Sequence, residues 1–253
     1  MDKDLIFGLH SIYHCLLNPK REYKTLVGTN EGFAELKKKY PDAHKYIEKC
    51  KVEKIESHEL QERAKKICLE LDVHYQRVPS QLYLLTSKKE IHDPSWLYDG
   101  VISGDIKRII CLDQVTDVHN AAAIVRTAAF YNVKALLFSN KGSFGNNPSF
   151  NRIASGGNEY ISFIRCKSLP KILTKLQDMG VHCLGFSEHA KGSKESKYKA
   201  QATCLIFGAE ETGMSHAVQR ILENIVSIDP QGSISSLNVS VAAAVGMEKY
   251  FAK

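Results

Sequence analysis

Residues 228–244, IDPQGSISSLNVSVAAA, hold the pattern that decides the fold of the second half of this chain. An apolar strand ends at Ile228, and a loop of Pro, Gly and Ser leads into an apolar, alanine-rich helix. Ser236 and Asn238 stand at the head of that helix, and either residue suits its N-cap. A strand that passes through such a loop into a helix is typical of an α/β sheet, in which ligands bind beyond the carboxyl ends of the strands.

The same alternation of strands and helices runs through the whole second half. The pattern predicts strands at 108–112, 135–138, 182–186, 204–207 and 225–228, and helices at 121–131, 169–179, 217–223 and 238–250. It favours an α/β fold with a mostly parallel sheet and helices on both faces over residues 105–253. Residues 79–104 are irregular and are predicted to be a linker, and residues 1–78 are predicted to form a small α/β domain.

The composition is that of an ordinary globular protein. The 253 residues include 34 Lys and Arg against 28 Asp and Glu, a formal charge of +6, and 43% are hydrophobic. No run approaches the roughly 18 apolar residues that span a membrane, and the first 30 residues lack the apolar segment of a signal peptide. A soluble, cytoplasmic protein without a membrane partner is expected.

Seven cysteines are scattered along the chain without a Cys-x-x-Cys pair. An odd number cannot close completely into intramolecular disulfides, so reduced thiols are predicted. His182 and Cys183 with His189 form the kind of local cluster that a zinc site uses, but their spacing matches no familiar ligand pattern. No metal site is predicted.

Two further segments place polar residues or glycines where strands end. In 117–128, DVHNAAAIVRTA, Asn120 is positioned to cap the next helix, and Arg126 lies nearly two turns along it. In 204–215, CLIFGAEETGMS, a buried strand runs into an acidic turn whose glycines let backbone approach a ligand closely. No Gly-Lys-Ser/Thr follows, so a ribose or adenine group suits this turn better than a phosphate. Taken singly, each segment also fits a plain capped helix or tight turn.

Together the three segments resemble the motifs of the SpoU (TrmH) family of RNA 2′-O-ribose methyltransferases, within the SPOUT class. The third segment matches almost letter for letter from Ser236 to Ala242, the first at Asn120 and Arg126, and the second at Gly208, Glu210 and Gly213. Residues 154–157 resemble the family's serine-glycine segment, and residues 8–21 are similar to the opening of members with an added RNA-binding domain. The resemblance is strongest over 105–253.

The resemblance implies a fold and a cofactor. In this family the C-terminal domain contains a deep trefoil knot that binds S-adenosylmethionine, and a small α/β domain resembling a ribosomal protein precedes it. The cofactor is held mainly by backbone groups of the knot loops, which carry over to Gly208, Gly213, Ile228 and Leu237. Periodicity alone gives no sign of a knot.

The implied reaction is methyl transfer to a ribose 2′-hydroxyl. The resemblance assigns Arg126 to raising the reactivity of that hydroxyl; because a guanidinium stays charged, it would place an RNA phosphate or stabilise a developing alkoxide. Asn120, Glu210, Ser236 and Asn238 are expected to orient the hydroxyl and shape the pocket.

The expected substrate is RNA, and the expected assembly is a homodimer. Members with this two-domain layout commonly modify a guanosine of large-subunit (23S) rRNA, and a tRNA remains the alternative substrate. Family members pair through the knotted domains. The formal charge, +1 over residues 1–104 and +5 over the rest, is consistent with RNA binding by the catalytic half.

Several positions depart from the family's pattern. Ala122 replaces a common glycine, and Asp229 with Pro230 replaces a Pro-Met pair. Glu211 stands where glycine is usual, so it either strains the backbone or adds a second carboxylate near the cofactor. These changes keep open a second reading, a catalytically weak RNA-binding or ribosome-assembly protein on the same fold. The Ser-Leu-Asn triplet argues against a base methyltransferase.

Overall fold

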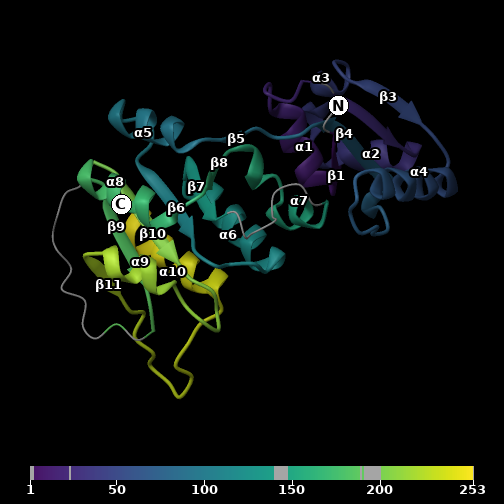
Figure 1. Cartoon of the computed structure of the whole chain (residues 1–253). Helices are drawn as coiled ribbons and strands as arrows, with labels where there is room; N and C mark the ends of the chain where they lie inside the picture. Colours follow the sequence, from purple (N-terminus) through teal and green to yellow (C-terminus); the bar gives the residue numbers. More distant parts are fainter. Residues whose placement is uncertain (1–2, 23, 140–147, 189, 191–200, 253) are drawn as a thin grey trace. The chain divides into compact units, whose positions relative to one another are not determined.

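The computed structural model describes residues 3–22, 24–139, 148–188, 190 and 201–252 (Figure 1). The chain divides into two compact units. The first comprises residues 1–89 together with 144–159, and the second comprises 90–143 together with 160–253. Within the described residues, no helix combines the length and the apolar character needed to cross a membrane.

The second unit is built on a parallel sheet. Its seven strands lie in the order β11-β9-β10-β6-β7-β8-β5, and every neighbouring pair is parallel. The strands are β5 (Ile91–His92), β6 (Arg108–Leu112), β7 (Ala135–Ser139), β8 (Ser162–Cys166), β9 (His182–Phe186), β10 (Thr203–Phe207) and β11 (Asn224–Val226). The predicted α/β class with a parallel sheet is confirmed. The trefoil knot stays a prediction.

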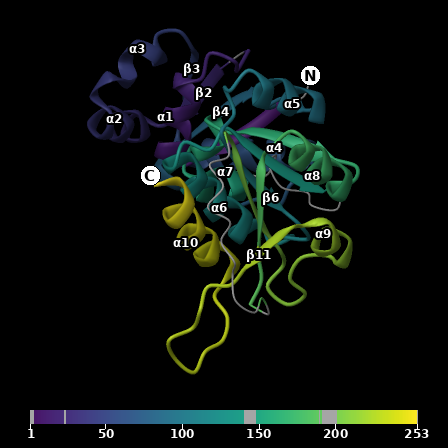
Figure 2. The ribbon, with the colours of Figure 1, turned by 90° about the vertical axis from the view of Figure 1, so that its left-hand side faces the viewer.

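Helices cover both faces of this sheet. They are α5 (Pro94–Ile102), α6 (Val118–Phe130), α8 (Leu169–Asp178), α9 (His216–Ile221) and α10 (Val239–Phe251). On one face, α5, α8 and α9 share a core with Ile206 of β10. On the other, Gly246 of α10 packs against Phe207, the next residue along the strand, and α6 lies beside α10 (Figure 2).

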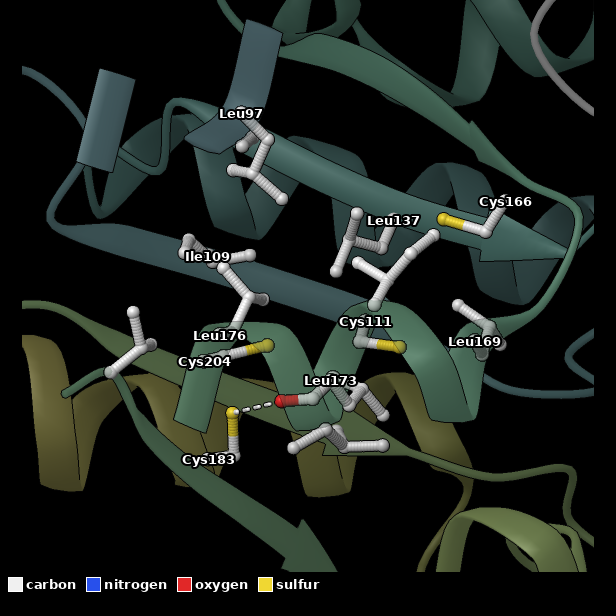
Figure 3. Packing of buried hydrophobic residues seen from close by; sticks show 14 of the residues in the cluster. Leu97, Ile109, Cys111, Leu137, Cys166, Leu169, Leu173, Leu176, Cys183 and Cys204 are labelled. Atoms are coloured by element: carbon white, nitrogen blue, oxygen red, sulfur yellow. Dashed lines mark hydrogen bonds between the residues drawn. The ribbon is translucent and has the colours of Figure 1, made fainter. Parts of the chain in front are cut away.

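Four cysteines are part of the core between the sheet and α8 (Figure 3). They are Cys111, Cys166, Cys183 and Cys204. All seven cysteines of the chain are free thiols, and burial raises the pKa of Cys166 to about 12. Because all four are buried in this core, their side chains act as packing groups. No group of three metal-ligating side chains gathers within the described ranges.

The first unit is also α/β, with a four-stranded sheet in the order β1-β4-β2-β3. The strands are β1 (Lys3–Phe7), β2 (Lys24–Gly28), β3 (Lys51–Lys54) and β4 (Leu82–Ser87), and the longer helices are α1 (Leu9–Leu17), α2 (Asn30–Lys39) and α4 (Ser57–Glu70), with the short α3 (His44–Ile47) before β3. β4 lies between β1 and β2 and is antiparallel to both, whereas β2 and β3 are parallel.

The predicted linker over residues 79–104 is wrong. Its first part is β4, a central strand with Leu82, Tyr83 and Leu84 fully buried, and its second part holds β5 and α5 of the other unit. The Ser, Pro, Asp and Gly residues in this stretch mark the turns between these elements rather than a loose connection.

The predicted single domain over residues 105–253 is also wrong at one place. Residues 148–159, between β7 and β8, belong to the first unit, where α7 (Pro148–Ala154) contacts α1 and β1. The contact is close, because a Cβ on Gly156 would lie 2.5 Å from the His14 ring of α1. No apolar period distinguishes this segment, so the sequence pattern assigned it to its neighbours in the chain.

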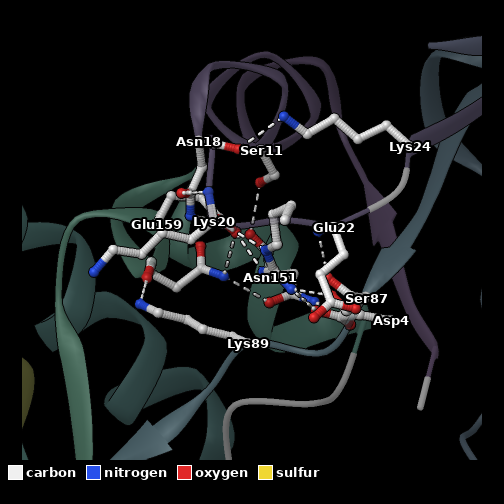
Figure 4. Close-up of polar contacts among 12 residues, drawn as sticks. Asp4, Ser11, Asn18, Lys20, Glu22, Lys24, Ser87, Lys89, Asn151 and Glu159 are labelled. Carbon is white, nitrogen blue, oxygen red and sulfur yellow. Dashed lines mark hydrogen bonds and ion pairs between the residues drawn. The ribbon is translucent and has the colours of Figure 1, made fainter. Parts of the chain in front are cut away.

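A buried ionic cluster holds this segment to the first unit (Figure 4). Arg21 binds Glu159 with both prongs of its guanidinium, at 3.0 Å from Nε to Oε2 and 2.6 Å from Nη2 to Oε1. Its third nitrogen, Nη1, donates to Asp4 at 3.1 Å and to the Ser87 carbonyl at 2.6 Å. Asn151 of α7 donates to the other oxygen of Asp4 at 3.1 Å. The side chains of Arg21, Asp4 and Glu159 are at most 2% exposed.

Burial and the charge of Arg21 shift the pKa values of Asp4 and Glu159 in opposite directions. Burial raises the pKa of Asp4 to about 6, although the charge of Arg21 opposes the shift. Burial by itself would raise the pKa of Glu159 as well, but the hydrogen bonds and charge of Arg21 outweigh it and lower that pKa overall. Both carboxylates are therefore anionic partners of Arg21 at neutral pH, and Asp4 is the first of the two to take up a proton as the pH falls.

Lys89 gives the first unit a predictable pH dependence. Its ammonium donates to the Asn158 carbonyl, and burial lowers its pKa to about 7, with the charge of Glu159 opposing the shift. The unfolded chain holds this proton up to about pH 10.5. Between pH 7 and that value the unfolded state keeps the Lys89 proton that the folded state loses, so the contribution of Lys89 to the free energy of unfolding rises with pH by at most about 1.4 kcal/mol per unit.

Replacing Lys89 by Met should remove this rise, as measured by the urea midpoint of unfolding at pH 7 and at about pH 9.5. The matched control is Lys65→Met, which changes an exposed lysine on α4. Equal pH slopes for wild type and Lys89→Met would contradict the assignment.

Candidate functional site

A cavity of about 390 Å³ lies at the carboxyl ends of β9 and β10. Phe186 and Phe207, the last residues of these strands, form part of its wall. The rest of the lining comes from the turn 208–213, the loop 228–237 and the first turn of α10, together with Ser187, Glu188 and Gln219. The volume is that of a small-molecule site, and the position is where parallel α/β sheets bind ligands.

Backbone contacts fix the acidic turn. Ala209 and Gly213 exchange two hydrogen bonds, at 3.0 and 2.8 Å. Gly208 has no room for a side chain, since a Cβ there would lie 2.1 Å from the carbonyl carbon of Gly213 and from the nitrogen of Met214. Gly213 itself has φ +66°, a conformation that favours glycine. The turn therefore needs both glycines that the sequence pattern singled out.

Asp113 fixes the chain just after this turn and was missed by the sequence pattern. This buried carboxylate directly follows β6 and accepts a 2.7 Å hydrogen bond from the backbone nitrogen of Ser215. Ser215 in turn caps α9. An aspartate immediately after a buried strand was the available signal.

Glu210 joins the three motif segments. Its Oε1 accepts hydrogen bonds from Asn120 Nδ2 at 3.1 Å, from the Val239 backbone nitrogen at 3.2 Å, and from Asn238 Nδ2. Asn238 Nδ2 also donates to Asn120 Oδ1 at 2.9 Å. Residues that are far apart in the sequence are thus held in one hydrogen-bonded network at the rim of the cavity.

The helix caps explain why Asn120 is available for this network. Asp117, not Asn120, caps α6, accepting from the Asn120 backbone nitrogen at 2.8 Å, so the predicted cap is wrong. For α10 the cap is Asn238, one of the two candidates, which accepts from Ser240 at 2.9 Å. Capping by Asp117 leaves the amide of Asn120 to cross-link the loops.

The structure brings most of the predicted site residues together. All four residues expected to hold the cofactor, Gly208, Gly213, Ile228 and Leu237, line the cavity. Glu210 and Ser236 line it as well. Arg126 does not: it is exposed on α6 and makes no hydrogen bond or ion pair with any residue in the described part of the chain. The role of each residue stays a prediction.

The departures from the family pattern are resolved by geometry. Glu211 does not lie among the residues with positive φ, so the expectation of a strained backbone is wrong. Glu211 and Asp229 are both among the residues that line the cavity. Ala122 is buried within α6 and has no need of a glycine's freedom.

The lining suits an adenosyl cofactor with a charged amino-acid tail. Ile234 and Leu237 line the cavity and are nevertheless 78% and 47% exposed, so an apolar ring has surface to cover. Carboxylates and the carbonyls of the turn offer acceptors to hydroxyl and amino groups. The residues present therefore fit S-adenosylmethionine.

Sequence comparison agrees with this site. The model of the SpoU rRNA Methylase family matches residues 107–248. The 23S rRNA (guanosine-2′-O-)-methyltransferase RlmB of Ralstonia nicotianae is 34% identical over 152 residues, 59% of each chain. RlmB of Escherichia coli is 31% identical over 149 residues, 59% of this chain and 61% of the relative. The match thus spans about three fifths of these relatives.

Solved structures match over a larger share of the chain. The SpoU methyltransferase AviRb from Streptomyces viridochromogenes, in complex with AdoMet, gives a TM-score of 0.70 at 17% identity, over 96% of this chain and 87% of that one. A TrmH-family putative RNA methyltransferase from Porphyromonas gingivalis gives 0.68 at 18% identity, with the same coverage. At these identities the likeness establishes the fold.

Proposed function

Because the chain belongs to the SpoU rRNA Methylase family, we propose that it transfers a methyl group from S-adenosylmethionine to a ribose 2′-hydroxyl of RNA. The observation that carries this proposal is the Glu210 network, which assembles the three motif segments beside a cavity fitted to the cofactor. The names of the matched relatives support a guanosine of 23S rRNA as the target. We also propose that the protein acts in the cytoplasm, where such a substrate is found.

Different residues would bind the cofactor and position the substrate. Gly208 to Gly213, Ile228 and Leu237 would hold the cofactor through backbone and apolar contacts. When bound, it supplies an electrophilic methyl group on a sulfonium sulfur. That group would be donated to the 2′-oxygen, with the bonding electron pair left on the sulfur and the hydroxyl proton released to solvent. Holding the two reactants together in a fixed geometry supplies a large share of the acceleration.

The Glu210 network leaves one carboxylate oxygen for substrate. Oε1 is occupied by three donors, whereas Oε2 makes no hydrogen bond with a described residue. Oε2 and the exposed hydroxyl of Ser236 are the groups that would orient the 2′-hydroxyl. Asn120 and Asn238 act one step back, by holding Glu210 in place.

A second copy of this chain is the partner that we propose for the second unit. Val241 and Val245, one turn apart on α10, are 48% and 41% exposed, and Phe130 at the end of α6 is 82% exposed. Adjacent helices that present apolar side chains to water are typical of an interface. Pairing through α6 and α10 would let one copy's Arg126 complete the other's site. Sedimentation equilibrium of the full chain should give twice the chain mass.

The activity is tested with the purified full chain and S-adenosylmethionine that carries a radioactive methyl group. Transcripts of 23S rRNA, 16S rRNA and a tRNA pool serve as substrates, and resistance to alkaline cleavage maps 2′-O-methylation. We expect one guanosine of 23S rRNA to be labelled. Labelling of tRNA alone would favour the tRNA alternative. RNA binding without labelling would favour the RNA-binding or ribosome-assembly protein.

A further inference from the structure

The cavity is acidic in a chain that is basic. Glu188, Glu210, Glu211 and Asp229 line it, and none of its lining residues in the described part of the chain is a Lys, Arg or His. The whole chain carries a formal charge of +6. A concave site lined by one sign of charge concentrates ligands of the other sign.

Two of these carboxylates make one hydrogen bond or none with other described residues. The Glu211 carboxylate makes no hydrogen bond or ion pair there, and the Asp229 carboxylate accepts one hydrogen bond, from the Ser227 hydroxyl at 2.7 Å. Glu210 differs, since its Oε1 accepts three hydrogen bonds that tie loops together. The negative charge of Glu211 and Asp229 is therefore available to a ligand in the cavity.

The proposed cofactor and its product differ by one charge. S-adenosylmethionine carries a sulfonium cation, an ammonium and a carboxylate, whereas the demethylated product has a neutral thioether and keeps the other two groups. Adenine and ribose contacts are common to both ligands and cannot separate them. Because both ligands carry the ammonium, a carboxylate in the cavity attracts both, but it stabilises the ligand with the additional sulfonium charge more strongly.

We propose that Glu211 and Asp229 make this cavity select by charge, binding S-adenosylmethionine more tightly than its neutral product, so that methyl transfer itself weakens the hold on the spent cofactor. This rests on the proposed function. The ratio of the two affinities depends only on the interaction with the sulfonium charge, because the adenine and ribose contacts contribute equally to both ligands.

Calorimetric titration of the full chain with each ligand tests the proposal. Wild type is compared with Glu211→Gln, Asp229→Asn and the double variant, and with Glu223→Gln as a control on an exposed carboxylate outside the cavity. Each cavity substitution should weaken binding of S-adenosylmethionine by about threefold to tenfold and leave the Kd of S-adenosylhomocysteine within about twofold. Sinefungin, which carries an amine in place of the methylated sulfur, should follow S-adenosylmethionine.

The outcomes separate the two proposals. If wild type binds neither ligand, the proposed function fails. If both bind and the double variant keeps the wild-type ratio of the two affinities, the charge selection is overturned while the function stands. Retained binding of S-adenosylhomocysteine shows that a variant is folded. Wild type alone gives a second test, because raising salt from about 50 mM to about 1 M should shrink the ratio, and a ratio independent of salt would contradict the proposal.

Discussion

Arg21→Ala is expected to lower the free energy of unfolding of the first unit by about 3 to 5 kcal/mol. The substitution leaves Asp4 and Glu159 buried, with side chains at most 2% exposed, and removes the cation that both of them bind. An uncompensated buried carboxylate costs far more than a lost surface contact, because water cannot replace the missing partner. Urea unfolding followed by circular dichroism measures the loss.

Arg63→Ala is the matched control for this prediction. Arg63 also binds two carboxylates, those of Glu53 and Glu59, at 2.9 and 2.5 Å, but its side chain is 43% exposed. Its removal should have a much smaller effect, since surface pairs are screened by water. Comparable losses in the two variants would mean that burial is not what makes the Arg21 cluster important.

Hydrogen exchange locates the damage from Arg21→Ala. The amides of α7 and of residues 157–159 should exchange faster than in wild type, because Glu159 and Asn151 hold this segment through Arg21 and Asp4. The amides of the parallel sheet in the second unit should keep their protection. Arg21→Lys should recover part of the stability, since an ammonium restores the charge without the two-pronged geometry.

Arg126→Ala should reduce kcat/KM for RNA methylation by at least about 100-fold, while leaving the Kd of S-adenosylmethionine unchanged. Arg126 lies outside the cavity and is exposed on α6, so no cofactor contact is lost with it. Its guanidinium is uncommitted among the described residues and is available to an RNA phosphate or a developing alkoxide. Filter binding of RNA and calorimetry with the cofactor separate these effects from folding.

Arg220→Ala controls for the loss of a positive charge, because Arg220 is exposed on α9 in the same unit. It should change methylation little. Arg126→Lys keeps the charge but not the planar fork, and it should fall between wild type and alanine. Normal turnover by Arg126→Ala would remove Arg126 from the proposed mechanism and leave the cavity assignment intact.

Continuous apolar runs made the parallel sheet predictable. β6 and β9 begin and end at the predicted residues, because a strand buried on both faces is apolar at almost every position. β4 was not predicted, because turn-forming residues flank it, although its side chains are buried. The docking of residues 148–159 depends on buried ion pairs between distant parts of the sequence, which no local pattern records.

The sequence predicted which residues form the site better than it predicted the contacts between them. The motif segments named Gly208, Glu210 and Asn238, all of which gather at the cavity. That Asp117 rather than Asn120 is the cap of α6 depends on local backbone geometry. Whether Glu211 strained the backbone or faced the cavity was decided by its φ, which a sequence does not give.

The insertion of residues 148–159 into the first unit determines which fragments of this protein can be separated. The chain passes between the units near residue 89, between residues 139 and 148, and near residue 159, so one cut does not release the smaller unit. A fragment beginning at residue 90 would keep Glu159 and Asn151 and lose Arg21 and Asp4, exposing in solution a carboxylate and a helix face shaped for an absent partner. Insertion, rather than tandem fusion, describes this architecture.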